Sequence, residues 1–221
     1  MPEKSISCTN GDLCQLAPEI DALKQEVSEL AELVSTDTLT GLNNYRHFTN
    51  IITQEIERSK RTAQPTTLIM VDADHFKKVN DDWGHETGNE ALKLIANCLK
   101  RNIRKLDIAC RYGGEEFAVI LPSSDIGTSA QVAERIREAV ESAVLTANNG
   151  TDTIPLTVSL GLSTYIVSQD DDWHKLVERA DQELYRAKQQ GRNQVCYTVE
   201  EVIEQQVSED EKSALFDMFK D

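Results

Sequence analysis

The seven residues Arg-Tyr-Gly-Gly-Glu-Glu-Phe at 111–117 constrain the fold more than any other stretch of this 221-residue chain. They join two runs, 107–112 and 117–121, whose composition is typical of strands. Two glycines between such runs predict a tight antiparallel hairpin, because glycine adopts positive φ without a Cβ clash. Two adjacent glutamates follow at once, and like charges so close repel each other unless a cation lies nearby. An isolated pair would indicate no more than a solvated turn, so its meaning depends on the rest of the chain.

A second acidic strand end lies earlier in the sequence. The apolar run 67–71 is typical of a buried central strand and ends in Asp72, Ala73 and Asp74. Side-chain alternation places Asp72 and Asp74 on the same side of the strand if it continues that far. Desolvating unpaired carboxylates is costly, and oxygen ligands without His or Cys suit Mg²⁺ or Mn²⁺ bound together with phosphates. We therefore expect Asp72 and Glu115 to converge on a divalent metal, with the Ala73 carbonyl as a third ligand. Such a site indicates metal-assisted phosphoryl or nucleotidyl transfer.

Composition predicts one sizeable globular domain with extensions. No run has the roughly 18 apolar residues that span a bilayer, and no signal-peptide pattern opens the chain, so we expect no membrane segment. Five scattered cysteines fit a reduced cytoplasmic protein. Of the net charge of −15, residues 1–36 carry −5, residues 199–221 carry −6 and residues 37–198 only −4. The middle region therefore need not repel a polyphosphate, and the absence of a basic stripe argues against a nucleic-acid partner.

The N-terminal segment carries a heptad pattern. Its apolar residues alternate in spacings of three and four, at Leu13, Leu16, Ile20, Leu23, Val27, Leu30 and Val34. This pattern predicts a short two-stranded coiled coil, although an amphipathic helix packed on its own domain would show it too. We expect a helical stalk over 1–36, a globular domain over 37–198 and an acidic tail over 199–221. The tail has a weak amphipathic patch, which either docks as a helix or stays mobile.

Within the middle region, helix and strand patterns alternate. Helices are expected at 45–62, 86–102, 127–146 and 173–189, a loop at 80–85, and strands at 67–71, 107–112, 117–121, 156–166 and 194–199. This order, with one antiparallel hairpin, predicts an α/β (α+β) domain in which helices cover a sheet.

Five ordered motifs then resemble one known family over nearly all of 37–198, the GGDEF domain of diguanylate cyclases. The matching stretches are 37–42, 72–81, 84–88, 111–117 and 180–193. The resemblance implies a palm-like, mostly antiparallel sheet. It also implies a bacterial enzyme that condenses two GTP into cyclic di-GMP. Each protomer holds one nucleotide, so the reaction implies a homodimer, to which the stalk contributes by raising the local concentration of the second half-site.

The resemblance assigns roles to individual residues. Asp72, the Ala73 carbonyl and Glu115 look like ligands of Mg²⁺ or Mn²⁺. Glu115, where the family more often has Asp, would help to deprotonate the ribose 3′-hydroxyl, and Glu116 would support the metal or the substrate. Substrate contacts are expected at Phe76, Lys77, Asn80, His85, Asn89, Gly113, Gly114, Lys188 and Arg192. Lys188 and Arg192, spaced i, i+4, would reach a phosphate from one helix face or its end, whereas without the other motifs they would be a solvated helix terminus.

Two further features bear on regulation and specificity. Arg104 and Asp107 form an R-x-x-D motif that resembles the family's product-inhibition site, so cyclic di-GMP is expected as an inhibitor as well as the product. Asn89 stands where the family usually has an Asp that accepts from guanine N1–H and N2–H. An amide offers one acceptor and one donor there, which leaves a relaxed choice of base open. The alternative to an active cyclase is a weak or inactive domain that serves as a receptor for cyclic di-GMP or another nucleotide.

Overall fold

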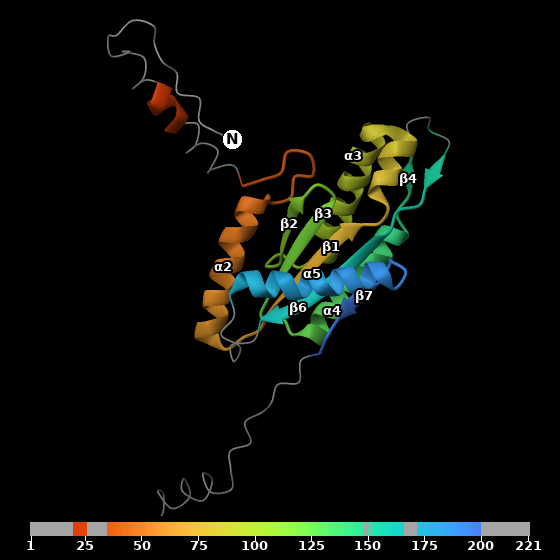
Figure 1. Ribbon diagram of the computed structural model, residues 1–221. Coiled ribbons are helices and arrows are strands. Elements are labelled where there is room, and N and C mark those ends of the chain that lie inside the picture. Colours follow the sequence, from red (N-terminus) through yellow and green to blue (C-terminus); the bar gives the residue numbers. More distant parts are fainter. Residues whose placement is uncertain (1–19, 26–34, 148–149, 151, 166–171, 200–221) are drawn as a thin grey trace, which may run out of the picture.

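The computed structural model describes residues 20–25, 35–147, 150, 152–165 and 172–199, and its centre is a five-stranded sheet in the order β2-β3-β1-β6-β7 (Figure 1). The strands are β1 (Thr66–Ala73), β2 (Ile108–Gly113), β3 (Glu116–Pro122), β6 (Val158–Tyr165) and β7 (Val195–Tyr197). The helices are α2 (Tyr45–Thr62), α3 (Phe76–Asn102), α4 (Ile126–Glu141) and α5 (Trp173–Gln189). A separate two-stranded sheet joins β4 (Leu145–Thr146) to β5 (Thr153–Ile154). The predicted α/β (α+β) class is confirmed.

β1 is the central strand, and all eight of its residues are buried. It pairs antiparallel with β3 on one side and with β6 on the other, while β7 runs parallel to β6 at the sheet edge. The register places Asp72 opposite Glu116 of β3 and Ser159 of β6. The sheet is thus mostly antiparallel, and its register brings carboxylates of β1 and β3 side by side.

Helices cover both faces of the sheet, so side chains of β1 alternate between two apolar layers. Ile69 and Val71 belong to the core that α3 and α4 complete. Leu68 and Met70 belong to the core beneath α2 and α5. Asp72 continues the row of Leu68 and Met70, and this alternation directs its carboxylate toward α5.

α5 lies directly on β6 because Gly161 has no side chain. A Cβ at this position would overlap the backbone nitrogen of Leu184 and the carbonyl oxygen of Ala180, both in α5. Figure 1 shows α5 crossing the sheet in front of β6. This close contact sets the distance between the C-terminal end of α5 and β1, the strand that carries Asp72.

Two expected elements are wrong. The stretch 80–85 is not a loop, because α3 already begins at Phe76 and is interrupted only at Gly84, whose φ of 83° and ψ of 163° are not helical. Glycine adopts this conformation without strain, so two helical pieces meet at a corner there. The helix expected at 127–146 ends at Glu141, and the chain continues into β4, which pairs with β5.

The terminal expectations lie largely outside the described residues. Of the stalk, the structure describes a helix at 20–25 in which Ile20 and Leu23 are 36% and 54% exposed. The remaining heptad positions, Cys8, Cys14 and the tail from 200 onward are not among the described residues. In the part of the chain that is described, no helix is both long and apolar enough to cross a membrane.

The contact at Gly161 gives a test of the packing. Gly161→Ala should lower the free energy of unfolding by about 3 kcal/mol or more, because backbone atoms of α5 cannot move aside as a flexible side chain can. Urea unfolding followed by circular dichroism measures the change. Gly127→Ala in α4 is the matched control, because a Cβ there meets only Asp125 Oδ1 at an ordinary 3.4 Å. Equal stability of the two variants would contradict the close approach of α5.

Candidate functional site

Three residues from distant parts of the chain meet at the carboxyl end of β1. Asp72 is only 7% exposed and lies opposite Glu116 of β3. Lys188, in the last turn of α5, reaches across the sheet and places its Nζ 2.8 Å from Asp72 Oδ2. The Lys188 ammonium therefore offsets part of the negative charge of Asp72 and Glu116, two carboxylates that would otherwise repel each other away from solvent.

The environment shifts the two carboxyls in the same direction. Burial raises the pKa of Asp72 and the charge of Asp74 adds to the rise, while Lys188 and Arg192 oppose it. Burial also raises the pKa of Glu116, and the nearby charge of Asp72 raises it further. Carboxyls with raised pKa values accept protons more readily than exposed ones, and a further cation at this site would lower their charge repulsion.

The β2–β3 hairpin brings Glu115 to the same end of the sheet. Its turn is formed by Gly114 and Glu115, since Gly113 still belongs to β2 and pairs with Glu116. Only Gly114 of the two glycines has a positive φ, 47°, so the expectation that both central positions would be glycine is wrong by one residue. The backbone nitrogen of Ala73 donates to the Glu115 carbonyl at 3.3 Å, which places the turn beside the end of β1.

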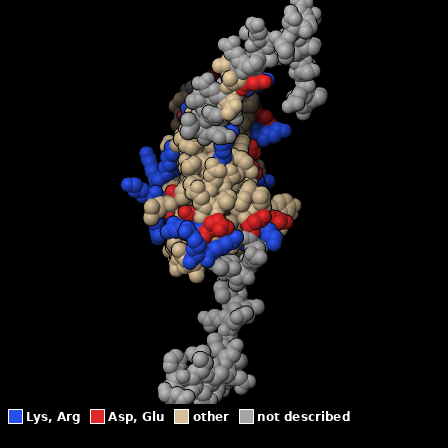
Figure 2. Space-filling model, turned by 90° about the vertical axis from the view of Figure 1, so that its left-hand side faces the viewer, with Lys and Arg blue, Asp and Glu red and all other residues tan. Residues whose placement is uncertain are grey.

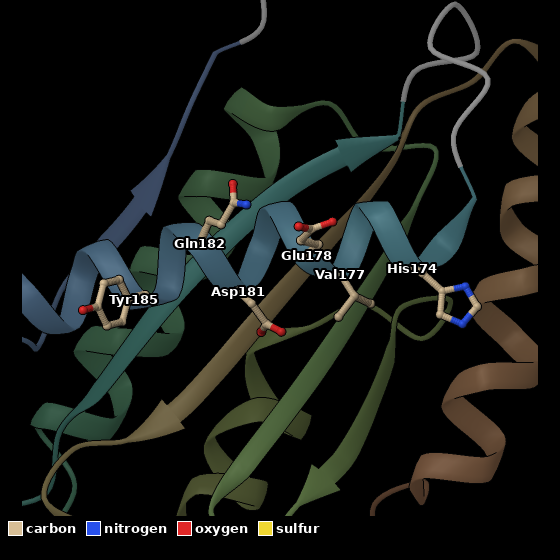
Figure 3. A pocket seen from close by; sticks show the side chains of 6 residues that line it. All are labelled: His174, Val177, Glu178, Asp181, Gln182 and Tyr185. Carbon is tan, nitrogen blue, oxygen red and sulfur yellow. The ribbon is translucent and has the colours of Figure 1, made fainter.

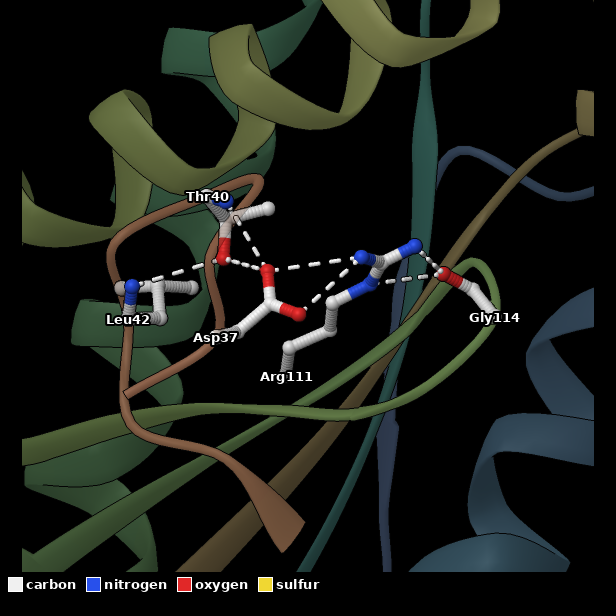
Figure 4. A network of polar contacts seen from close by, with 5 residues as sticks. All are labelled: Asp37, Thr40, Leu42, Arg111 and Gly114. Carbon is white, nitrogen blue, oxygen red and sulfur yellow. Dashed lines mark hydrogen bonds and ion pairs between the residues drawn. The ribbon is translucent and has the colours of Figure 1, made fainter. Parts of the chain in front are cut away.

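Arg111 ties this hairpin to the segment 37–42, which we call the N-terminal strap. The Arg111 guanidinium donates from Nε and Nη2 to the Gly114 carbonyl, at 3.0 and 2.8 Å (Figure 4). Its Nη1 also pairs with Asp37 at 3.2 Å. Asp37 also accepts from the nitrogen and hydroxyl of Thr40, at 2.9 and 2.6 Å. The planar guanidinium thus restrains the turn from outside the sheet.

The start of α3 lies beside these carboxylates in the chain. His75 is its N-cap in a left-handed conformation, without a side-chain hydrogen bond to the first turn. Phe76 is buried, whereas Lys77 is exposed. The first backbone N–H groups of a helix have no intrahelical acceptor, so this end is suited to an anion.

The corner of α3 brings the two amide residues of the predicted base site near each other. Asn80 packs its Oδ1 where a Cβ of Gly88 would lie, so only glycine at 88 permits this contact. Asn89 follows directly and is exposed. His85 is also exposed, next to the break at Gly84.

The two cations of the last motif do not share a helix face. α5 ends at Gln189, so Arg192 lies beyond it in the following turn, with a φ of 64°. Lys188 alone pairs with Asp72, although the charge of Arg192 also favours the ionised form of Asp72. The expectation of one helix face is wrong, because the chain leaves the helix between the two residues, while the alternative placement at the helix end agrees with the structure.

Arg104 and Asp107 occupy a different part of the molecule, at the opposite end of β2 from the hairpin turn. The backbone nitrogen of Arg104 donates to Asp107 Oδ2 at 2.7 Å, and Asp107 N donates to the Arg104 carbonyl at 3.1 Å. Leu106 at the tip is 79% exposed. Arg135 of α4, which the sequence did not single out, donates to the carbonyl of Asn102 just before this turn.

Described residues near the site line two surface depressions. One of about 510 Å³ follows α5, where Val177 and Asp181 project on the side of the β2–β3 hairpin and Tyr185 lies further along (Figure 3). Asp181 is close enough to this hairpin that its charge contributes to the raised pKa of Tyr112, about 12, whose main cause is burial. The other, of about 380 Å³, lies beside Asp74 and the first turns of α3.

Basic side chains gather at one end of a face rather than along it. Figure 2 views the side of the molecule that carries α2, and in its lower part Lys and Arg gather with Asp and Glu among them. The last turn of α2 contains Lys60 and Arg61. The middle of this face is uncharged. The basic end is distinct from the carboxylate site at the end of β1.

The donor set at the end of β1 fits a divalent metal only in part. Asp72, Glu115 and Glu116 supply oxygen atoms alone, and Lys188 already places a positive charge on Asp72. Among the described residues, no group of three or more His, Cys, Asp or Glu side chains is arranged to hold a metal unaided. Mg²⁺ usually completes its shell with waters and substrate phosphates, so an incomplete protein shell is compatible with it.

Comparisons with known proteins agree on one family. Residues 34–194 match the family described as "Diguanylate cyclase, GGDEF domain". The diguanylate cyclase DosC of Escherichia coli K12 is 38% identical over 181 residues, which cover 82% of this chain and 38% of DosC. The chain thus spans well under half the length of the curated relatives it matches.

Two solved structures share the fold. The coiled coil and GGDEF domain of DgcB from Caulobacter crescentus, in complex with c-di-GMP, aligns with a TM-score of 0.73 and 31% identity, covering 82% of this chain and 94% of that one. The active GGEEF domain of a diguanylate cyclase from Vibrio cholerae aligns with a TM-score of 0.66 and 30% identity, covering 71% and 97%.

The Arg111 contacts generate a prediction about stability. Arg111→Lys should lower the free energy of unfolding by about 1 kcal/mol, because an ammonium cannot reach Asp37 and the Gly114 carbonyl with the same planar fork. Hydrogen bonds from Thr40 and the charge of Arg111 lower the pKa of Asp37 despite its partial burial. The stabilisation by Asp37 should therefore be complete above the ordinary carboxyl pKa and be lost as the pH falls through its lowered value.

Urea unfolding at neutral and acid pH measures both effects. Arg58→Lys is the control, because Arg58 makes only an exposed pair with Glu55 in α2. A loss of stability at Arg111 no larger than at Arg58, or one unchanged by Asp37→Asn, would contradict the role of this network.

Proposed function

The chain belongs to the GGDEF domain family of diguanylate cyclases, and from this premise we propose that it joins two GTP molecules into cyclic di-GMP and releases two pyrophosphates. The observation that carries the proposal is the buried Asp72 carboxylate, held beside Glu116 and within 2.8 Å of Lys188. Such an arrangement presents both a cation-binding carboxylate and a phosphate-binding amine at one point.

The metal would be held by Asp72, Glu115 and the carbonyl of Ala73, with substrate phosphates completing the shell. A bound Mg²⁺ or Mn²⁺ would neutralise charge on the α-phosphate and on the departing pyrophosphate. The pKa of Asp72, which burial raises even though Lys188 lies beside it, is consistent with this assignment, because a metal would stabilise the ionised carboxylate. Lys188 would then leave Asp72 and pair with a phosphate instead.

The triphosphate would lie between the C-terminal end of α5 and the start of α3. Lys188 and Arg192 supply cations from the end of α5, and the backbone N–H groups of Phe76 and Lys77 supply donors at the start of α3. Gly113 and Gly114 leave the hairpin without side chains, and the space that a Cβ would occupy at either glycine is open to 4 Å, which leaves room for a nucleotide there.

The guanine base would be held at the corner of α3. Asn80, fixed against Gly88, offers an amide to the base edge, and Asn89 lies next to it. We favour GTP because Asn89 retains one acceptor, although replacing a charged acceptor by an amide weakens guanine binding by about 1.5–3 kcal/mol. The exposed position of Asn89, on the piece of α3 that follows the break at Gly84, also leaves a relaxed choice of base open.

In the reaction, the ribose 3′-oxygen of one GTP attacks the α-phosphorus of the other. A new P–O bond forms, the bond between the α- and β-phosphates breaks, and pyrophosphate leaves. Glu115 would accept the hydroxyl proton, and Glu116, with its raised pKa, is the alternative acceptor. The second identical step closes the ring, which requires two protomers facing each other, and the N-terminal stalk would hold them together.

A second candidate function is a receptor for cyclic di-GMP. Arg104 and Asp107 support it, because they form an ordered, solvent-facing turn at the far end of β2 from the carboxylates. In an active cyclase the same turn would inhibit catalysis once product accumulates. In a receptor, with Asn89 impairing GTP binding, it would be the principal ligand site.

One incubation separates the two functions. Micromolar protein with Mg²⁺ and GTP should give cyclic di-GMP, and specific activity should rise with protein concentration because two half-sites must meet. Mass spectrometry of incubations with GTP, ATP or both identifies the product, and Asn89→Asp should raise the preference for GTP by about tenfold or more. Asp72→Asn is the inactive control. A wild-type protein that forms no cyclic dinucleotide yet binds cyclic di-GMP would establish the receptor instead.

Product inhibition has its own test. Arg104→Ala should leave the initial rate unchanged and weaken inhibition by added cyclic di-GMP by about tenfold or more, because a charged hydrogen-bond donor is lost. Lys105→Ala removes a neighbouring cation and serves as the control. Inhibition of the same strength in Arg104→Ala and wild type would mean that the product acts elsewhere, for example at the substrate site.

A further inference from the structure

Asp74 is buried two residues beyond Asp72, and the proposed chemistry does not use it. Its carboxylate accepts three hydrogen bonds: from Ser159 Oγ to Oδ1 at 2.6 Å, and from Thr157 Oγ1 and the backbone nitrogen of Asn193 to Oδ2 at 2.8 and 3.0 Å. Both oxygen atoms are therefore occupied by donors from the entry to β6 and from the turn after α5. A carboxylate satisfied in this way has little capacity left for a metal.

The turn that Asp74 contacts is conformationally demanding. Arg192 and Asn193 both have positive φ values, 64° and 46°, although neither is glycine. Consecutive left-handed residues persist only where their surroundings hold them. Here Arg192 N donates to the Ala187 carbonyl at 3.0 Å, and Asn193 N donates to Asp74.

The side chain of Asn193 is held from a second direction. Its Nδ2 donates to Glu141 Oε1 at 2.7 Å, and Arg137 Nη1 donates to its Oδ1 at 3.0 Å. Arg137 also pairs with Glu141 at 2.8 Å. The left-handed turn is thus fastened to the end of β1 through its backbone and to the end of α4 through its side chain.

The two aspartates hold the end of α5 in different ways. The contact of Asp72 with Lys188 is an ion pair that must open if Lys188 moves to a phosphate. The contact of Asp74 with Asn193 uses a backbone N–H that is not among the proposed substrate contacts. We infer that Asp74 is a positioning residue, which keeps the end of α5 in place when Lys188 leaves Asp72, so that Lys188 and Arg192 meet the triphosphate in a defined position.

This inference rests on the proposed cyclase function for its kinetic consequence but not for its structural one. Asp74→Ala removes all three hydrogen bonds. Asp74→Asn is the conservative variant, because its carbonyl oxygen can still accept from Asn193 N while Ser159, a hydroxyl, can turn to accept from the amide. Thr157→Val removes one donor and keeps the shape of the side chain.

Hydrogen exchange read by NMR gives the first measurement. In Asp74→Ala the amide of Asn193 should exchange about tenfold faster or more, while amides of β1 and α4 keep their protection, and Asp74→Asn should restore most of the protection. Kinetics give the second measurement. The KM for GTP should rise about tenfold with a smaller change in kcat, because misplaced cations weaken phosphate binding. Thr157→Val should show smaller increases in exchange at Asn193 and in KM. This variant tests the inference if Asp74→Ala does not fold.

Three results would overturn the inference. Unchanged exchange at Asn193 in folded Asp74→Ala would show that Asp74 does not hold the turn after α5. Faster exchange throughout β1 and α4 would show a general contribution to the core. A loss of kcat without a change in KM or exchange would be the behaviour of a metal ligand. A wild-type protein that makes no product would refute the cyclase function alone, since exchange at Asn193 still decides whether Asp74 holds the turn.

Discussion

The burial of Asp72 opposite Glu116 is the constraint on which the rest of this structure depends. Two carboxylates side by side at the end of a central strand are unfavourable unless positive charge reaches them. Lys188 provides it, and it can do so only because α5 lies directly on β6 at Gly161. The close packing of α5, which buries its apolar face, thus also brings one amine to one carboxylate. A divalent cation would offset the remaining negative charge in the same way.

Three separate sets of contacts hold the groups around Asp72 and Glu116 in place. Arg111 joins the hairpin turn to the N-terminal strap, so the place of Glu115 depends on the segment into which the predicted stalk leads. The corner at Gly84 folds the first piece of α3 against the second and brings Asn80 to Gly88. The left-handed turn after α5 is held by both Asp74 and the end of α4. No single element carries the site, and a change in any of the three would alter the distances between its groups.

Much of this arrangement could be predicted from the sequence. The buried strand that ends in Asp72, the hairpin and the helices at 45–62 and 173–189 were all visible as apolar periodicity and turn residues, which local physics dictates. The length of α3 could not be predicted, because residues 80–85 are mostly polar and contain a glycine, a composition typical of a loop, yet the helix runs through them with a break only at Gly84. The sequence also could not decide whether Arg192 lies on α5 or beyond it, because i, i+4 spacing says nothing about where a helix ends. The sequence placed Asp74 on the same side of the strand as Asp72 without giving it a role, and only the folded protein reveals its three donors.

The position of Lys188 near the end of the described domain has a consequence for synthesis on the ribosome. Asp72, Glu115 and Glu116 emerge early, whereas α5 and β7 emerge last, and β7 completes the sheet by pairing with β6. Until then the growing chain carries adjacent acidic groups without the amine that compensates them, at the end of its central strand. An incomplete product would therefore lack both β7 at the sheet edge and the end of α5 that carries Lys188. Termination before residue 188 would leave Asp72 and Glu116 without the amine that compensates them.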